Sequence, residues 1–305
     1  MYVFLPIAQV SVNVLLLVGI GALVGVVSGL FGVGGGFLLT PLLMFSGISP
    51  MVAAASDSAQ IVASSTAGTL AHSRAGTVDY KMALVLFCGG VFGSLAGVRL
   101  LEWLNAFGPS NTVIRLLYIL LLGVIGGMML IEAVRTWRRG AYMSERRFRP
   151  IPHPSWADRL PWRLTFPKSE IEISALLPLS MGAVGGLLAA LMGVGGGFIM
   201  VPLMLYILRM RMHVVAGTSL LQILFTCIVV TMLQSSRNHT VDFVLALLLA
   251  VGSATGAVVG ARLGRKLRAD QLKILLAILV LLTAARVAID VFTRPAVMLS
   301  HLAGH

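Results

Sequence analysis

The sequence predicts an all-α polytopic membrane protein made of two inverted repeats, each with about five membrane segments. The first support is composition, because 58% of the 305 residues are hydrophobic and 11% are charged, whereas soluble domains average about 25% charged residues. The mean hydropathy is +0.96. Apolar runs of about 20 residues, long enough to cross a bilayer, recur along the chain. An internal duplication covering most of both halves is the third support.

Around ten apolar segments are predicted, five in each half. The second segment of each half would span only about 20 Å as a helix, so we expect a short or tilted helix that starts near the membrane interior. The N-terminus has no basic region and no evident cleavage site, so the first segment is expected to be retained rather than cleaved. The predicted segments are 10–31, 37–49, 52–73, 80–101 and 112–134, then 173–193, 197–208, 213–234, 241–262 and 270–292.

These segments divide the chain into a first transmembrane repeat (1–136), a linker (137–172) and a second transmembrane repeat (173–305). The linker is rich in basic residues and proline, which predicts a cytoplasmic segment with a short interfacial helix around 156–162. Five crossings per half place 18 Lys and Arg residues inside and 5 outside, whereas four parallel crossings give 14 and 9. The positive-inside rule therefore favours the inverted arrangement, with both termini outside. The net charge of +12 fits this bias, and no nucleic-acid partner is predicted.

A run of glycines interrupts each repeat. The run Gly-Val-Gly-Gly-Gly-Phe occupies 32–37, with Pro41 after it, and recurs at 193–198, with Pro202 after it. Glycine breaks helices, and a break inside the bilayer is tolerated only where protein or a watery cavity surrounds it. The helix that follows exposes N–H groups and the positive end of its dipole, which can bind a small anion. Two matched breaks indicate a transporter site, in which the two helix starts are expected to face one another near the membrane midplane. The alternative is that the glycines only permit tight helix crossing.

The third segment of each half is unusually polar for a membrane span. Its hydroxyl and amide groups can donate to an anion, or they can serve only helix–helix hydrogen bonds. The offset of 161 between the glycine runs matches Asp57 with Thr218 and Ser58 with Ser219. Asp57 is a candidate proton carrier, because an ionisable group in a membrane span is expensive to retain, and a helix cap near the outer interface is the alternative.

The fourth segments begin with a second matched motif at an offset of 163. Asp79 and Asp242 are expected to cap these helices. Arg74 and Arg237 either attract anions at the two mouths of the pathway or anchor the helices at the interface. The motifs Gly-x-x-x-Gly at 93–97 and 256–260 predict close packing faces.

Metal and cofactor sites are not predicted, because the histidines show no metal-ligand spacing. Cys88 and Cys227 are expected to be buried packing residues. The predicted substrate-binding residues are Gly34, Gly35, Gly36, Phe37, Ser58, Gln60, Gly195, Gly196, Gly197, Phe198, Thr218, Ser219 and Gln222. Asp57, Arg74 and Arg237 are assigned to coupling or gating.

Several of these motifs together resemble one known family. They are the glycine pattern from Gly25 to Pro41, its echo from Gly186 to Pro202, the run 216–219, and the two Arg-x-x-Thr-Val-Asp segments. The doubled pattern resembles the TauE/SafE family of sulfite exporters, over about 10–135 and 175–292. This resemblance implies movement of a small sulfur-containing or organic anion, such as sulfite or a sulfonate. It also implies a Thr-Ser pair in the third segment, where the first half has Asp57-Ser58 instead.

We therefore predict a secondary transporter that exports a small anion across a bacterial inner membrane, with proton coupling through Asp57. The alternatives are a passive anion channel and an importer of a small carboxylate or sulfur oxyanion. An enzyme is disfavoured because the sequence has no cluster of histidine, aspartate and cysteine that could form a catalytic site. A further option is a non-transporting membrane scaffold whose binding element is the basic linker. The partners are the anion and the lipid bilayer. The sequence leaves open the substrate, the direction, the coupling ion and the oligomeric state, with a homodimer as one option.

Overall fold

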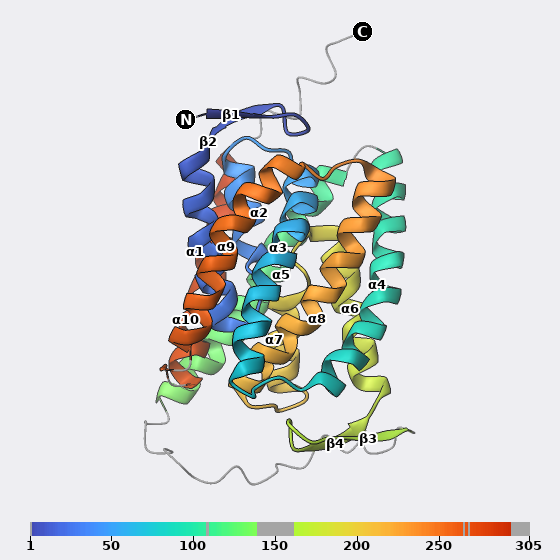
Figure 1. Cartoon of the computed structure of the whole chain (residues 1–305), viewed down its shortest axis with the longest axis vertical. Helices are drawn as coiled ribbons and strands as arrows, with labels where there is room; N and C mark the ends of the chain where they lie inside the picture. Colours follow the sequence, from blue (N-terminus) through green and yellow to red (C-terminus); the bar gives the residue numbers. More distant parts are fainter. Residues whose placement is uncertain (1, 108–109, 139–161, 265, 268, 294–305) are drawn as a thin grey trace.

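The computed structural model describes residues 2–107, 110–138, 162–264, 266–267 and 269–293, which form a helical bundle with two short β-hairpins (Figure 1). The first half contains β1 (Tyr2–Leu5), β2 (Val10–Asn13), α1 (Val14–Phe31), α2 (Gly36–Phe45), α3 (Pro50–Arg74), α4 (Tyr80–Ala106) and α5 (Ser110–Arg138). The second half contains β3 (Arg163–Phe166), β4 (Ile171–Ser174), α6 (Leu176–Met192), α7 (Gly197–Tyr206), α8 (Met212–Leu233), the π-helix η3 (Gln234–Asn238), α9 (Phe243–Gly264) and α10 (Ala269–Thr293).

Every predicted apolar segment overlaps one of these helices, so the mostly helical class is confirmed. The short second segment of each half is also confirmed, because α2 and α7 have 10 residues each. Within the described residues, four helices are long and apolar enough to cross a membrane. These four are Val14–Phe31, Tyr80–Ala106, Met212–Asn238 and Phe243–Gly264.

The two β-hairpins were not predicted. Tyr2 pairs with Asn13 in the first hairpin, so α1 starts at residue 14 rather than at residue 10. Arg163 pairs with Ser174 in the second hairpin, which occupies the last part of the predicted linker. The rest of the linker, 139–161, and with it most of the predicted interfacial helix, lies outside the described residues. The hairpins lie at opposite ends of the helical bundle (Figure 1).

The helices pack in two groups that each contain one helix from the other half. Group A is α1, α2, α3 and α9, and group B is α6, α7, α8 and α4, while α5 pairs with α10. The predicted packing faces are confirmed, because a methyl group on Gly93 would collide with the backbone of α6 and one on Gly256 with that of α1. Helices α3 and α8 cross where the two groups meet.

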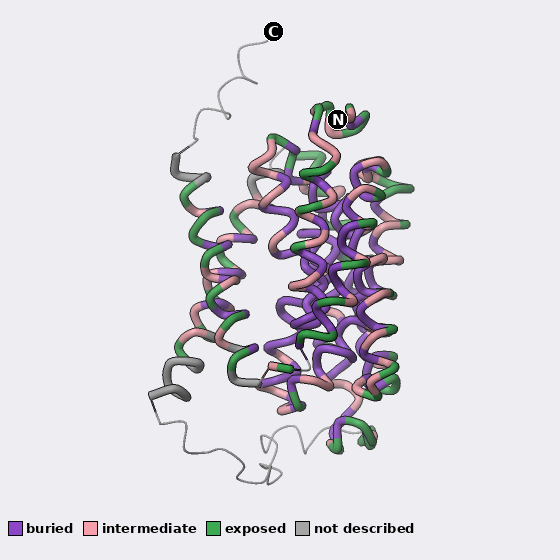
Figure 2. Tube along the Cα trace, turned by 60° about the vertical axis from the view of Figure 1, so that its left-hand side comes forward, coloured by how far each residue is buried: buried purple, intermediate pink, exposed green. Residues whose placement is uncertain are grey.

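Burial follows this arrangement. Buried residues concentrate in the centre of the bundle, and exposed ones lie along its outer helices (Figure 2). Helix α3 is exceptional because most of its buried side chains are small or polar, including Ser56, Asp57 and Gln60. Since buried polar groups cost free energy unless they are paired, this polar core marks where function is to be sought.

Candidate functional site

Each glycine run forms a sharp turn between two helices. Gly32 caps the end of α1 with a φ of 75°, and Gly35 caps the start of α2 with a φ of 81°. The second turn repeats this conformation, with φ values of 73° at Gly193 and 74° at Gly196. A left-handed backbone strains residues that carry a Cβ atom, so glycine is required here. Both turns are fully buried.

The two turns contact one another inside the protein, as the sequence predicts. A methyl group on Gly36 would lie 2.8 Å from the Cα atom of Val194. The reciprocal contact is present as well, because a methyl group on Gly197 would collide with the carbonyl group of Val33. The starts of α2 and α7 are therefore brought together from opposite halves of the chain.

Both helix starts carry backbone N–H groups that lack an acceptor within the described part of the chain. Gly35 O accepts from the N–H groups of Leu38 and Leu39, and Gly196 O accepts from those of Ile199 and Met200. The preceding N–H groups, from the first two residues of α2 and of α7, have no acceptor among the residues the structure describes. Helix N-termini leave such donors free and carry partial positive charge, so both turns can accept negative charge.

Asp57 places a carboxylate at the start of α2. Its Oδ2 atom accepts a hydrogen bond of 2.6 Å from Thr40 Oγ1 and would lie 2.9 Å from a methyl group on Gly36. Its Oδ1 atom has no partner among the described residues, although Asp57 is fully buried. The alternative of a helix cap is wrong, because α3 begins at Pro50 and Asp57 lies about two turns inside it.

The structure corrects the predicted matching of α3 with α8. Ala54 packs on the second glycine turn and Ala216 on the first. Likewise, Ser56 Oγ accepts from Asp242 N (2.9 Å), and Thr218 Oγ1 accepts from Asp79 N (3.0 Å). These contacts match each residue of α3 with the residue of α8 whose number is higher by 162. The sequence predicted a difference of 161, which is the spacing of the glycine runs.

Two single-residue insertions in the second half explain why the offset rises from 161 at the glycine runs to 162 and then to 163. Four residues separate α2 from α3, whereas five separate α7 from α8. The other extra residue lies between α8 and α9, where the chain forms η3, and a π-turn holds one more residue than an α-turn. Asp57 therefore matches Ser219, and Gln60 matches Gln222.

Hydroxyl groups on α3 and α8 fasten the two turns. Ser219 Oγ donates to Gly32 O at 2.6 Å, and Ser58 Oγ lies 3.3 Å from Gly193 O. The hydroxyl of Thr218 instead accepts a hydrogen bond from Asp79 N, just before α4 begins. In this structure Ser58 and Ser219 hold the backbone, and their donation to an anion stays a prediction.

The two matched glutamines are fully buried and incompletely paired. Both polar atoms of the Gln60 amide lack partners among the described residues, and so does Gln222 Oε1. Gln222 Nε2 donates to Thr226 Oγ1 at 2.9 Å. Unpaired amides inside a protein are costly, so these groups are available for a ligand or for water.

Three apolar residues that the sequence did not assign to the site pack against the turns. Ile61, Ile223 and Cys227 form one fully buried cluster. A methyl group on Gly34 would lie 3.2 Å from Ile223 Cγ2 and 3.4 Å from Ile61 Cγ2. A sequence gives no signal for them, because isoleucine is ordinary in a membrane helix.

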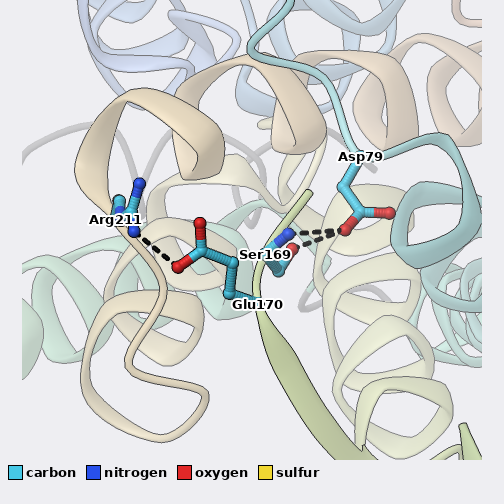
Figure 3. Close-up of polar contacts among 4 residues, drawn as sticks. All are labelled: Asp79, Ser169, Glu170 and Arg211. Atoms are coloured by element: carbon cyan, nitrogen blue, oxygen red, sulfur yellow. Dashed lines mark hydrogen bonds and ion pairs between the residues drawn. The ribbon is translucent and has the colours of Figure 1, made fainter. Parts of the chain in front are cut away.

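The two predicted helix caps are confirmed, and each also holds a hairpin. Asp79 accepts from Met82 N at 3.1 Å and from both the N–H and the hydroxyl of Ser169 (Figure 3). Asp242 accepts from Leu245 N at 3.1 Å and from the N–H groups of Ile7 and Ala8. Each aspartate therefore fastens the hairpin that precedes the other half.

Four further charged residues lie beside helix ends or in loops: Arg74, Glu170, Arg211 and Arg237. Glu170 in the second hairpin pairs with Arg211 before α8 (Figure 3). Arg74 and Arg237 are exposed, and Arg237 lies 3.5 Å from Glu102. Their role in attracting anions stays a prediction.

The two cysteines differ in exposure. Cys227 is buried, as expected, but Cys88 is exposed, so the prediction that both are buried is wrong. Cys88 lies on α4, whose outer face carries exposed apolar side chains such as Leu84, Phe92 and Leu95.

Comparisons with known proteins agree with this picture. The family model described as "Sulfite exporter TauE/SafE" matches residues 17–287. The chain is 26% identical to the probable membrane transporter protein YjnA of Bacillus subtilis, over 80% of this chain and 86% of that protein. It is 25% identical to the probable membrane transporter protein YunE of the same organism, over 88% and 94%. It is also 40% identical to the sulfite exporter TauE/SafE family protein 1 of Arabidopsis thaliana, over 33% of this chain and 23% of that protein. No solved structure matches the chain significantly.

Proposed function

Since the chain belongs to the sulfite exporter TauE/SafE family, we propose that it is a secondary transporter that exports a small anion such as sulfite or a sulfonate. Members of this family are membrane transporters, so the chain is a multi-pass membrane protein and not an enzyme. The substrate, the direction and the coupling that we propose go beyond this assignment.

The proposed topology is two inverted repeats, each with five membrane segments. Three observations support it: the hairpins lie at opposite ends of the bundle, α1 packs with α9 as α6 packs with α4, and the charge bias favours inversion. In this topology the linker is cytoplasmic, both termini face outward, and the membrane is a bacterial inner membrane.

The observation that carries the proposed function is the meeting of the two glycine turns. Their free N–H groups, together with two helix dipoles, give an anion site that needs no lysine or arginine. The matched amides of Gln60 and Gln222 supply further polar groups on α3 and α8. The residues proposed to bind the anion remain those predicted from the sequence, with Thr218 the least direct because its hydroxyl is committed to Asp79 N.

The two turns are not equivalent, and we assign them different roles. Asp57 already places a carboxyl group at the start of α2, whereas the matched Ser219 places a hydroxyl near the first turn. An anion is repelled by an ionised Asp57, so we assign anion binding to the turn at Gly195–Phe198 and proton binding to Asp57. Export of the anion and movement of the proton are then linked by their charge interaction.

Alternating access follows from the two helix groups. The turns, α3 and α8 lie where group A meets group B, so rotation of one group against the other would expose the turns to one side and then to the other. Because the two repeats are inverted in this topology, the state open to one side of the membrane and the state open to the other have equivalent geometry.

Transport by purified protein in proteoliposomes tests this function. We expect flux of sulfite, and loss of that flux in Gly36→Ala and Gly197→Ala, because each added methyl group meets the opposite turn. Gly19→Ala is the matched control, since a methyl group there has nothing within 4 Å.

Ligand binding provides a second measurement for the same variants. A bound anion raises the melting temperature of the folded protein, so sulfite, thiosulfate, sulfonates and small carboxylates can be ranked in one screen. Unchanged flux in folded Gly36→Ala and Gly197→Ala would remove the turns from the site, and single-channel current steps would replace the transporter by a channel.

A further inference from the structure

Ile61 and Ile223 occupy the same place in the two halves. Ile61 lies on α3 and Ile223 on α8, and the offset of 162 that aligns these helices matches them with each other. Both are fully buried and belong to one hydrophobic cluster with Cys227. They come from different helix groups, so this cluster crosses the boundary between group A and group B.

Each isoleucine covers both glycine turns. A methyl group on Gly195 would lie 2.8 Å from Ile223 Cγ2 and 3.6 Å from Ile61 Cγ2, and the corresponding distances at Gly34 are 3.2 Å and 3.4 Å. The Cδ1 atom of Ile61 also reaches Gly36, and that of Ile223 reaches Gly197. Both glycine turns are therefore covered by the same two apolar side chains.

We propose that Ile61 and Ile223 form the constriction that closes the anion pathway and limits the size of the anion that passes. This proposal rests on the proposed function of the glycine turns. Apolar side chains at a narrow point exclude water and hydrated ions, so their contact seals the pathway without a charged gate. Separation of the two helix groups pulls the isoleucines apart, because one belongs to each group.

Buried Cys227 gives a test that does not depend on the transported anion. It lies beside the constriction, because a methyl group added to Gly195 would lie 2.9 Å from its Sγ atom. In a Cys88→Ala background, labelling by the anionic reagent 2-sulfonatoethyl methanethiosulfonate reports access to this point, because labelling of a buried thiol follows the population of open states. We expect Ile61→Ala and Ile223→Ala each to raise the labelling rate about tenfold or more.

The control is Ile173→Ala, which shortens a buried isoleucine on β4, away from the turns. It should leave the labelling rate of Cys227 within about twofold of the parent. Labelling that stays unchanged in folded Ile61→Ala and Ile223→Ala would overturn the constriction. The milder Ile61→Val and Ile223→Val variants apply the same test if the alanine variants do not fold.

Flux measurements separate this proposal from the proposed function. We expect the ratio of flux of a large sulfonate to flux of sulfite to rise in Ile223→Ala and to fall in Ile223→Phe. An unaltered ratio with intact transport would overturn the size limit. Faster labelling without transport of any anion would support the constriction and reject the proposed transport function.

Discussion

The carboxylate of Asp79 is expected to be a major source of stability at one end of the bundle. Asp79→Ala removes a helix cap and two hydrogen bonds from Ser169, at 3.0 Å from its N–H and 2.6 Å from its hydroxyl. A lost cap costs about 1 kcal/mol, and a lost bond to a charged group costs about 1.5 kcal/mol at the low end. Since Asp79 is buried, we expect the free energy of unfolding to fall by about 4 kcal/mol.

Thermal unfolding in detergent micelles, followed by tryptophan fluorescence, measures this change. The apparent melting temperature of Asp79→Ala should fall by about 5 to 10 °C. Glu172→Ala, which removes an exposed carboxylate from the same hairpin, should change the free energy by about 0.5 kcal/mol or less. Asp79→Asn should lie between the two, because asparagine still caps the helix.

Asp242 offers an internal repeat of the experiment. It also accepts three hydrogen bonds, from the N–H groups of Leu245, Ile7 and Ala8. Asp242→Ala should therefore destabilise the protein by a similar amount at the opposite end of the bundle. If either alanine variant melts within 1 or 2 °C of Glu172→Ala, roughly the scatter of such a measurement, the reasoning on hairpin attachment is refuted.

Two further predictions concern single charges. Asp57→Asn should abolish the dependence of anion flux on the pH gradient, and Asp57→Ser, which reproduces the matched Ser219, should behave in the same way; a persisting dependence in liposome assays would remove Asp57 as the proton carrier. Breaking the exposed ion pair with Glu170→Gln should lower the free energy of unfolding by about 1 kcal/mol or less, because water screens both Glu170 and Arg211, and a loss as large as that of Asp79→Ala would contradict this.

Helix positions could be predicted because each apolar segment carries its own signal. The predicted segment 80–101 and the observed α4, Tyr80–Ala106, begin at the same residue, where Asp79 supplies the cap. The hairpins could not be predicted in this way. Each of their strands has 4 residues, too short for a periodic pattern to stand out, and the second lies at the end of a basic, proline-rich stretch.

The site could be predicted only where backbone conformation dictates the residue type. The glycine turns require glycine at positive φ, so their position and their meeting followed from the sequence. The residue of the second half that matches Asp57 could not be predicted in this way. One inserted residue lies in the loop before α8, and it does not change the apolar pattern of the sequence. The place of Ile61 and Ile223 at the site could not be predicted either, because it depends on how the two halves of the chain pack together.

The exchange of the fourth helix between the two groups has a consequence for biogenesis. Helix α1 leaves the ribosome early, yet the surface on which Gly25 and Gly29 pack belongs to α9, which ends at residue 264. Most of the chain must therefore be inserted before the first helix finds its neighbour, and neither half expressed alone contains a complete group. A single-repeat ancestor with this packing would have had to assemble as a pair of subunits, each of which packs its fourth helix on the first helix of the other.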